Sequence, residues 1–361
     1  MTGRDRISGL PSNVVEHILR FLPLREAVRT SVVSRKWANK WVHMRALVLD
    51  DKFGKVVKPV ASAANNKLML DVCNVLMRHR ARLNAFSLSI PDLRSAFSDH
   101  RIGQIIGSLD DQHIESLSIE IKDYVLPSCI FSFTRLKNLK LCGCQFRSSV
   151  VAFHSSAFAE LDVLELRGLA VPKLGGEARF SFNCPLLSSL TMEGCGLSTN
   201  KIGIVIEAPK LDYCRISGSF SLLEFKHTPL LKTVHVHQDL SYIEDKGYSN
   251  FKKFTDALRS VEQLSISGYF YNIGKQQVFV DGSQNLVIKS KNRRAQLKRV
   301  KVEQFDGTKM EMGLVRSLLS ASPALDQMEI KFSASHRDRW LICKEMLGFA
   351  RASPTAQIAI E

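Results

Sequence analysis

The residues of this sequence that could bind a metal ion are cysteines and histidines at short spacing. Cys142 and Cys144 are separated by one residue, with His154 further along, and His235 and His237 would share one face of a strand. Structural zinc sites usually combine four such ligands. The sequence offers neither a second cysteine pair for the first group nor a third ligand for the second, so we expect no metal site and no cofactor.

Motifs that carry enzyme chemistry are also missing from the sequence. It has no nucleotide-binding P-loop, no dinucleotide fingerprint, no zinc-protease helix and no Gly-x-Ser-x-Gly nucleophile. Catalytic groups can be dispersed along a chain, so the missing motifs argue against an enzyme without excluding one. We therefore interpret the chain as a binding protein, not an enzyme, whose secondary-structure elements position a recognition surface.

The composition is typical of a globular intracellular protein. The chain has 361 residues, of which 45% are hydrophobic and 24% charged, enough for two or three domains with a sizeable core. No apolar run reaches the ~18 residues that span a bilayer, and we expect no signal peptide and no membrane partner. Eight scattered cysteines then favour reduced thiols in a soluble protein of the nucleus and/or cytoplasm. The net charge of +15 is spread along the chain, which favours an acidic protein partner over nucleic acid.

A recurring apolar pattern indicates the elements that would present a recognition surface. From residue 83 onward, ten copies of apolar-x-x-apolar-x-apolar follow one another at intervals of 20 to 36 residues. The copies begin at Leu83, Ile114, Leu136, Leu161, Leu187, Leu211, Leu231, Val261, Leu297 and Leu325. Such intervals are typical of leucine-rich repeats, in which each copy forms one short strand and the strands stack in parallel.

Two further signals support this register. In four copies a proline stands two residues before the first apolar position, where a turn would lead into the strand. These prolines are Pro185, Pro209, Pro229 and Pro323. In two copies a cysteine, Cys144 or Cys195, stands five residues after the middle apolar position, where we expect the side chain to turn inward.

Residues between the apolar positions would point outward and form a polar strip along the strands. We expect this strip to bind a protein target, because aromatic and arginine side chains commonly anchor interfaces. The candidate substrate-binding residues are Lys140, Arg167, Tyr213, Arg215, His235, His237, Arg299 and Lys301. The alternatives are a solvated strand face without a partner, and target binding at a convex loop or at the C-terminal segment.

The first fifty residues predict a compact helical unit. Apolar residues recur at helical spacing over 14–22 and 24–32, with Pro23 between the two runs. Asn13 and Glu16 have the spacing of a capping box at a helix start. A unit this small cannot bury all of its Leu, Val, Ile and Trp side chains. The surplus would contact either a partner or the rest of the chain.

The string DRISGLPSNVVEHILRFLPLREAVRTSVVSRKWANKW, residues 5–41, resembles the F-box in its Leu-Pro opening, its two helices and its final Trp. The resemblance implies binding to the Skp-type adaptor of a cullin–RING ubiquitin ligase. The positions that would contact the adaptor are Leu10, Pro11, Ile18, Leu19, Leu22, Pro23, Val28, Val32, Val33 and Trp37. Some of these residues must form the core of the module, and the resemblance does not divide core from contact.

The C-terminal segment, residues 305–361, resembles the FBD region of plant F-box/leucine-rich-repeat proteins through the strings ASPAL and RASPTAQI. We expect it to form a last helix–strand repeat and a closing helix that covers the final apolar edge. Just before it, residues 289–301 contain seven Lys or Arg and no acid. We interpret them as a solvated basic loop, with a nuclear localisation signal or a contact to an acidic ligand as alternatives.

The predicted fold class is therefore α/β, with a small N-terminal helical F-box followed by a leucine-rich-repeat solenoid with a parallel concave sheet. The expected boundaries are 1–50 for the F-box, 51–82 for a linker and capping helix, 83–304 for the leucine-rich repeats and 305–361 for the FBD-like C-terminal repeat and cap. The resemblance implies a substrate-recognition subunit of a Skp–cullin–F-box ubiquitin ligase. The alternative is a leucine-rich-repeat scaffold without ligase activity.

Overall fold

The computed structural model describes the chain in segments. They are 9–32, 35, 37–50, 61–90, 100–110, 114–148, 150–171, 178–195, 202–238, 254, 258–268, 295–333 and 339–361. Val33, the expected linker at 51–60 and the basic segment up to residue 294 lie outside these residues. The chain divides into two compact units, which are described separately. Unit 1 comprises Met1–Arg147 and Ser156–Leu161, and unit 2 comprises Ser148–Ser155 and Asp162–Glu361.

Unit 1 begins with a module of short helices. They are α1 (Ser12–Leu19), α2 (Leu24–Arg29), η1 (Thr30–Val32) and η2 (Lys40–His43). Helices α1 and α2 start directly after Pro11 and Pro23. Proline suits a helix start because its φ angle is fixed near the helical value, and because the first N–H groups of a helix have no acceptor within it, so the missing N–H of proline costs nothing there. The capping box predicted at Asn13 and Glu16 is wrong. Asn13 already lies inside α1, and no side chain caps that helix.

Parallel strands follow the helical module in unit 1. They are β1 (Ala46–Leu49), β2 (Ala85–Ile90), β3 (Ser116–Ile121) and β4 (Asn138–Cys142). The helical connections are α4 (Ala61–Arg78), α5 (His100–Asp110) and η3 (Ser128–Phe131). Leu47, Phe86, Leu117 and Leu139 occupy matching positions on successive strands. Strand β1 was not predicted, and it starts the sheet directly after the helical module.

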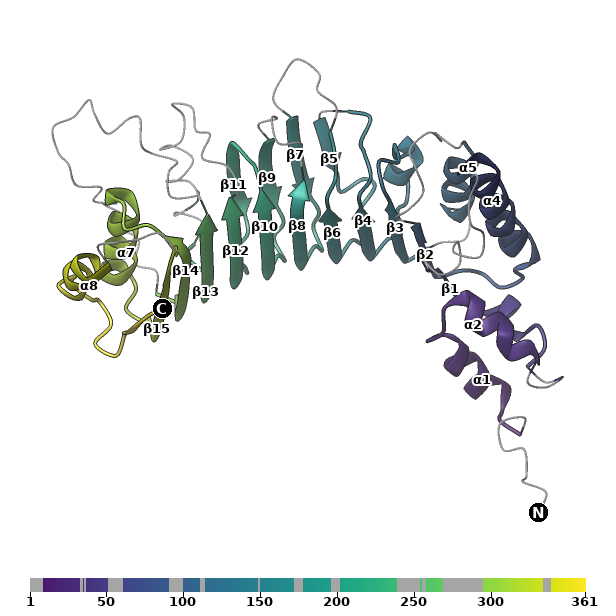
Figure 1. The fold of residues 1–361 in the computed structure, drawn as a ribbon, viewed down its shortest axis with the longest axis horizontal. Coiled ribbons are helices and arrows are strands. Elements are labelled where there is room, and N and C mark those ends of the chain that lie inside the picture. Colours follow the sequence, from purple (N-terminus) through teal and green to yellow (C-terminus); the bar gives the residue numbers. More distant parts are fainter. Residues whose placement is uncertain are drawn as a thin grey trace. The chain divides into compact units, whose positions relative to one another are not determined.

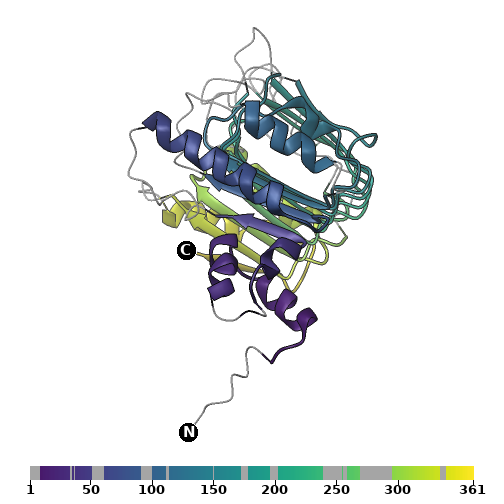
Figure 2. The ribbon, with the colours of Figure 1, turned by 90° about the vertical axis from the view of Figure 1, so that its right-hand side faces the viewer.

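Unit 2 contains two parallel sheets (Figures 1 and 2). In spatial order, the described strands of the main sheet are β6 (Val163–Arg167), β8 (Ser189–Cys195), β10 (Tyr213–Gly218), β12 (Thr233–Gln238), β13 (Gln263–Gly268), β14 (Arg299–Phe305), β15 (Gln327–Phe332) and β16 (Gln357–Ile360). The second sheet consists of β5 (Val150–Phe153), β7 (Ala178–Asn183), β9 (Ile202–Glu207) and β11 (Leu222–His227). This second sheet was not predicted. It buries stacked aromatic rings, with Phe153 and Phe182 centred 5.2 Å apart.

The predicted repeat register is confirmed at every copy. Each copy of the apolar pattern contributes one parallel strand, and every apolar position in it is at most 2% exposed. In β10, for example, Cys214 and Ile216 are buried, whereas Tyr213 and Arg215 between them are partly exposed. This alternation arises because successive side chains of a strand point to opposite faces. The buried positions fill the interior and leave the polar strip on the outer face of the main sheet.

The prolines that were predicted to mark turns do lie in turns. Ahead of β10, the Leu211 N–H donates to the Ala208 carbonyl at 3.1 Å, closing a turn whose second residue is Pro209. Equivalent bonds close the proline-containing turns ahead of β8, β12 and β15. Proline suits this position because its fixed φ angle matches the one that the turn requires.

A backbone contact links each repeat of unit 2 to the next at the start of the strands. The Ser188 carbonyl, just before β8, accepts N–H bonds from Asp212 and from the following residue, at 2.9 and 3.0 Å. The carbonyls just before β6, β10, β12, β13 and β14 accept two bonds in the same way. Some side chains at these positions also pair, as Lys232 does with Asp212 at 3.4 Å. We call this set of contacts the strand-start clamp, and it fixes the register of neighbouring repeats.

The cysteines that were predicted to turn inward are buried. Cys144 is fully buried, and the Cys195 thiol donates to the Leu166 carbonyl at 3.4 Å. Burial raises the pKa of the Cys144 thiol to about 12, so it stays protonated at neutral pH. In the described part of the chain, no group of three or more metal-ligating side chains is close enough to hold an ion. No helix in that part is long and apolar enough to cross a membrane.

The C-terminal segment differs from the prediction. Its helices are α7 (Lys309–Ala321) and α8 (Arg339–Leu347), but the segment ends in strand β16, not in a closing helix. Ile358 and Ile360 pair in register with Met328 and Ile330 of β15. The ASPAL string therefore precedes β15, and the RASPTAQI string runs into β16. Strand β16 has only a few apolar residues between polar ones, too few for the two-residue alternation of a strand to be recognised in the sequence.

Candidate functional site

The helical module of unit 1 separates its apolar residues into a core and an exposed set. The core consists of Val15, Leu19, Leu24, Ala27, Trp37, Trp41, Val42 and Met44. Two predicted adaptor-binding residues, Leu19 and Trp37, thus lie in the core and act through the fold of the module. Leu10, Leu22 and Pro23 are partly exposed, and Pro11 is exposed.

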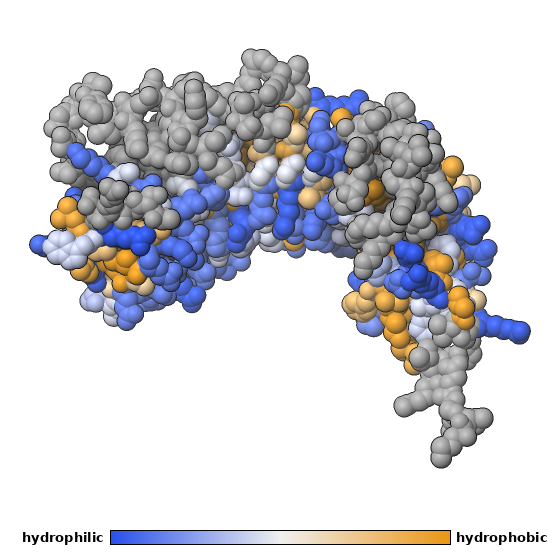
Figure 3. Space-filling model, viewed as in Figure 1, coloured by the Kyte–Doolittle hydropathy of each residue, from blue (hydrophilic) through white to orange (hydrophobic). Residues whose placement is uncertain are grey.

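Among the described residues of this module, four large apolar side chains face solvent. Ile18 and Val28 are 36% and 39% exposed, Phe21 is 72% exposed and Val32 is 89% exposed. Three of them were predicted, whereas Phe21 was treated only as part of the α1 pattern. Its ring packs edge-on against His17, 5.1 Å between centroids, which orders it at the surface. Exposed apolar side chains on a small module make a candidate protein-binding surface. Hydrophobic side chains are visible over α1 and α2 in Figure 3.

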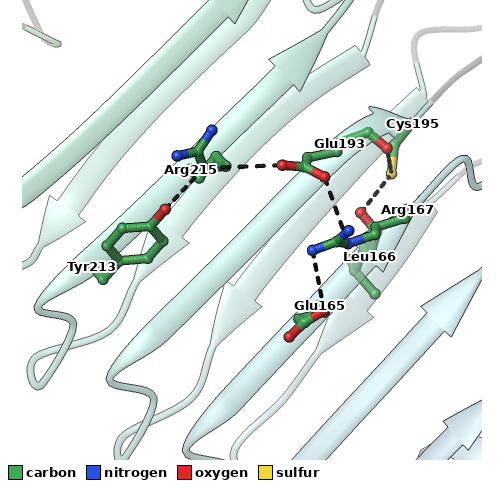
Figure 4. Close-up of polar contacts among 7 residues, drawn as sticks. All are labelled: Glu165, Leu166, Arg167, Glu193, Cys195, Tyr213 and Arg215. Atoms are coloured by element: carbon green, nitrogen blue, oxygen red, sulfur yellow. Dashed lines mark hydrogen bonds and ion pairs between the residues drawn. The ribbon is translucent and has the colours of Figure 1, made fainter. Parts of the chain in front are cut away.

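The polar strip of unit 2 is a network and not a row of separate side chains (Figure 4). Arg167 pairs with Glu165 at 3.4 Å and with Glu193 of the next strand at 3.5 Å. Arg215 Nε donates to the Tyr213 hydroxyl at 2.8 Å and lies 3.9 Å from Glu193. These contacts connect β6, β8 and β10 on the outer face, and they hold the Tyr213 and Arg215 side chains in defined positions.

The two histidines continue the strip on β12. The His235 ring lies 5.7 Å from the Tyr213 ring, between centroids, and His237 Nδ1 lies 2.7 Å from the Ser267 hydroxyl. Burial, with a smaller contribution from Arg215, lowers the pKa of His235 below its usual value. His235 is therefore mostly neutral at pH 7 and presents a polar aromatic surface beside Tyr213.

The remaining strip residues lie further along or in the other unit. On β14, Lys301 pairs with Glu303 at 2.8 Å and Glu329 at 3.2 Å, and these carboxylates raise its pKa. Arg299 is exposed on the same strand. Lys140 lies on β4 of unit 1, so only seven of the eight predicted residues share one unit.

The acids of this network make the strip mixed in charge. Arg167, Arg215 and Lys301 each lie within 4 Å of a carboxylate, so positive and negative side chains alternate along it. Glu193 and Glu303 were missed. They share a register position with Arg167 and His237, which were predicted, but the two glutamates were not themselves named.

These features define a two-part protein, in which a helical module with exposed apolar side chains precedes leucine-rich repeats with an ordered polar face. Residues 7–48 match the family model of the F-box domain. An F-box/FBD/LRR-repeat protein of Arabidopsis thaliana is 26% identical over 98% of this chain and 98% of its own length. F-box/LRR-repeat protein 13 of the same plant is 24% identical over 99% and 96%. An FBD-associated F-box protein is 27% identical over 73% of this chain and 66% of its own. The chain therefore carries an F-box domain and is homologous, over most of its length, to plant F-box/FBD/LRR-repeat proteins.

Proposed function

We propose that this protein is a substrate-recognition subunit of a Skp–cullin–F-box ubiquitin ligase, acting in the nucleus or cytoplasm. Its F-box binds a Skp-type adaptor and, through the adaptor, a cullin. The leucine-rich repeats hold a protein target. The chain contributes no reacting group. It brings a target lysine close to a conjugating enzyme bound elsewhere in the assembly, which lowers the entropic barrier to transfer.

The observation that carries this proposal is the exposure of four large apolar side chains on the F-box, Ile18, Phe21, Val28 and Val32. Fully burying one such side chain contributes about 1.5–3 kcal/mol. Phe21 and Val32 are the most exposed of the four, so folding of the module buries little of these two side chains. Their burial under an adaptor would supply binding energy that folding of the chain leaves unused.

The test measures the affinity of the full chain for a purified Skp-type adaptor by calorimetry. Phe21→Ala/Val32→Ala removes the two most exposed side chains and should weaken binding by at least about tenfold, since 1.4 kcal/mol corresponds to one factor of ten. Leu230→Ala, a similarly exposed apolar residue of unit 2, is the matched control and should bind normally. Equal affinities for all three proteins would remove the proposed adaptor surface.

For the target, we propose the strip centred on Tyr213, Arg215, His235 and His237. Its alternating charges favour a target segment that carries both acids and bases, which can replace the internal ion pairs as they are buried. Tyr213→Ala/Arg215→Ala should leave the melting temperature nearly unchanged, because both side chains lie on the outer face. It should reduce ubiquitination of a target identified by affinity purification with the proteasome blocked.

The second candidate is a leucine-rich-repeat scaffold without ligase activity. The ordered strip favours it as much as it favours a ligase subunit, since both bind a partner there. Adaptor binding separates them. A chain that captures a target but does not bind any Skp-type adaptor is a scaffold.

A further inference from the structure

Helix α8 exposes apolar side chains at the C-terminal end of unit 2. Trp340, Leu341 and Leu347 are 72%, 61% and 62% exposed. The neighbouring helix α7 is different, because the large apolar residues whose burial is described there are buried and the exposed positions described are Lys309, Arg316 and Ser320. The outer face of a terminal repeat is normally polar, which keeps the end of a repeat array soluble. Figure 3 shows hydrophobic side chains over α8.

These exposed side chains do not hold the helix in place. Met346 is fully buried, and Ile342 packs on Gly307, within 2.9 Å of where a Cβ would stand. Gly307 has a φ angle of 65°, a conformation suited to glycine, and leaves room for the isoleucine. The inner side of α8 therefore anchors it, whereas Trp340 and Leu347 on the other side are largely exposed.

The exposed residues form one continuous face. Positions 340, 344 and 347 follow the i, i+4, i+7 spacing of a single helical stripe, and Leu341 stands one turn before Lys344 on the adjoining row. The Lys344 ammonium lies 5.1 Å from the centre of the Trp340 ring. We call Trp340, Leu341, Lys344 and Leu347 the α8 face.

The charge around the α8 face is positive and lacks acid partners within the described residues. Lys344 lies over the Trp340 ring, and Arg339 contacts the Ser333 carbonyl and the Phe332 ring. The one acid of α8, Glu345, is already paired with Arg316 at 3.3 Å. A molecule that covers Trp340 also takes the Lys344 ammonium out of water. Burying this charge is unfavourable unless the molecule supplies a carboxylate.

We propose that the α8 face is a docking site for a short acidic segment of another protein, one that carries apolar side chains on one side and Asp or Glu beside them. The size of the face favours a short segment over a second copy of the chain. A nine-residue helix is about 14 Å long, and one helix of this length cannot supply the ~800 Å² per partner of a stable dimer. The site is separate from the F-box and from the strip, so it stands whether or not the proposed ligase function does.

The test uses the full chain and two fluorescein-labelled helical peptides of about three turns. Both carry leucine along one face. One has glutamate at its other positions, and its twin has lysine there. We expect fluorescence anisotropy to show binding of the glutamate peptide and not of the lysine peptide. Trp340→Ala/Leu347→Ala should weaken glutamate-peptide binding by at least about tenfold. Lys344→Glu should abolish it and allow the lysine peptide to bind.

Leu186→Ala/Leu230→Ala removes two exposed leucines from other parts of unit 2 and serves as the matched control. Circular dichroism checks that every variant melts as the parent does. Equal binding of both peptides, or peptide binding that survives Trp340→Ala/Leu347→Ala, would overturn the proposal. Two other results would also overturn the proposal. If the parent dimerises with rising concentration and Trp340→Ala/Leu347→Ala does not, the face binds a second copy of the chain. If the parent binds lipid vesicles and the double variant does not, the face binds a lipid surface.

Discussion

At Glu311, the buried acid at the start of α7, two substitutions can separate the effect of losing a hydrogen bond from the effect of burying a charge on the free energy of unfolding. Its carboxylate accepts the N–H groups of Thr308 and Asp306 at 2.7 and 3.1 Å, and the Thr308 hydroxyl accepts the Glu311 N–H at 3.4 Å. This is a capping box, and the residue is only 4% exposed. Glu311→Ala leaves two N–H groups without their acceptor. We expect it to lower the free energy of unfolding by about 1–2 kcal/mol, the usual effect of losing a cap.

Glu311→Gln should behave differently, because glutamine keeps the accepting oxygen without the charge. Burial raises the pKa of Glu311, with Asp306 adding to the effect. The folded state therefore holds the proton more tightly than the unfolded state does. The tighter proton binding stabilises the folded state. This contribution is fully present below the pKa that Glu311 has in the unfolded state, and it is lost as the pH rises through its pKa in the folded state. The glutamine variant does not have this loss, so its stability relative to the parent should increase with pH.

The assay is urea unfolding followed by circular dichroism, at about pH 4 and at about pH 8, values that bracket the titration of a glutamate with a raised pKa. Glu345→Gln is the control, since it removes an exposed acid and should change stability by less than about 1 kcal/mol at both pH values. Equal destabilisation by Gln and by Ala at the higher pH would refute the reasoning. It would show that the negative charge itself stabilises the start of α7.

Three further outcomes are expected. Leu190→Ala, at a fully buried strand position, should lower the free energy of unfolding by about 2–5 kcal/mol in urea titrations, whereas Ser189→Ala beside it should be nearly neutral. Pro209→Ala should destabilise by about 0.4–1 kcal/mol in the same assay, because the unfolded chain gains freedom at the turn. Iodoacetamide with mass spectrometry should label the partly exposed cysteines first, since burial raises the pKa of the Cys214 thiol and blocks access to it. The cysteines expected to react first are Cys73, Cys129, Cys142 and Cys343.

The repeat register was predictable because its signal is local. In a strand whose one face is buried, inward positions must be apolar, and this alternation appears directly in the sequence. The second sheet carries a similar alternation, as in Phe180 and Phe182 of β7, but it falls between the repeat copies at variable distances and was not predicted. Strand β1 was missed because its four residues adjoin the helical module and were read as part of it.

The candidate sites were less predictable, because they depend on neighbours that are distant in sequence. The pairing of Arg215 with Glu193 joins different strands, and no local pattern shows it. The division of Ile18 and Leu19 into an exposed and a buried residue depends on how α1 rotates against the elements beside it. Helical spacing places both residues near one face and leaves that rotation open.

The strand-start clamp also bears on how this protein can change over evolution. The contacts that set the register lie in a short stretch of each repeat, the turn and the residue before the strand, and they involve mainly backbone atoms. Substitutions on the outer face of the sheet therefore leave the clamp intact, and so do insertions between the end of one strand and the next turn. A whole repeat can be gained or lost if, in the repeats that then become neighbours, the carbonyl before one strand still accepts the N–H groups at the start of the next. The polar strip can thus acquire new side chains one strand at a time while the rest of the unit keeps its fold.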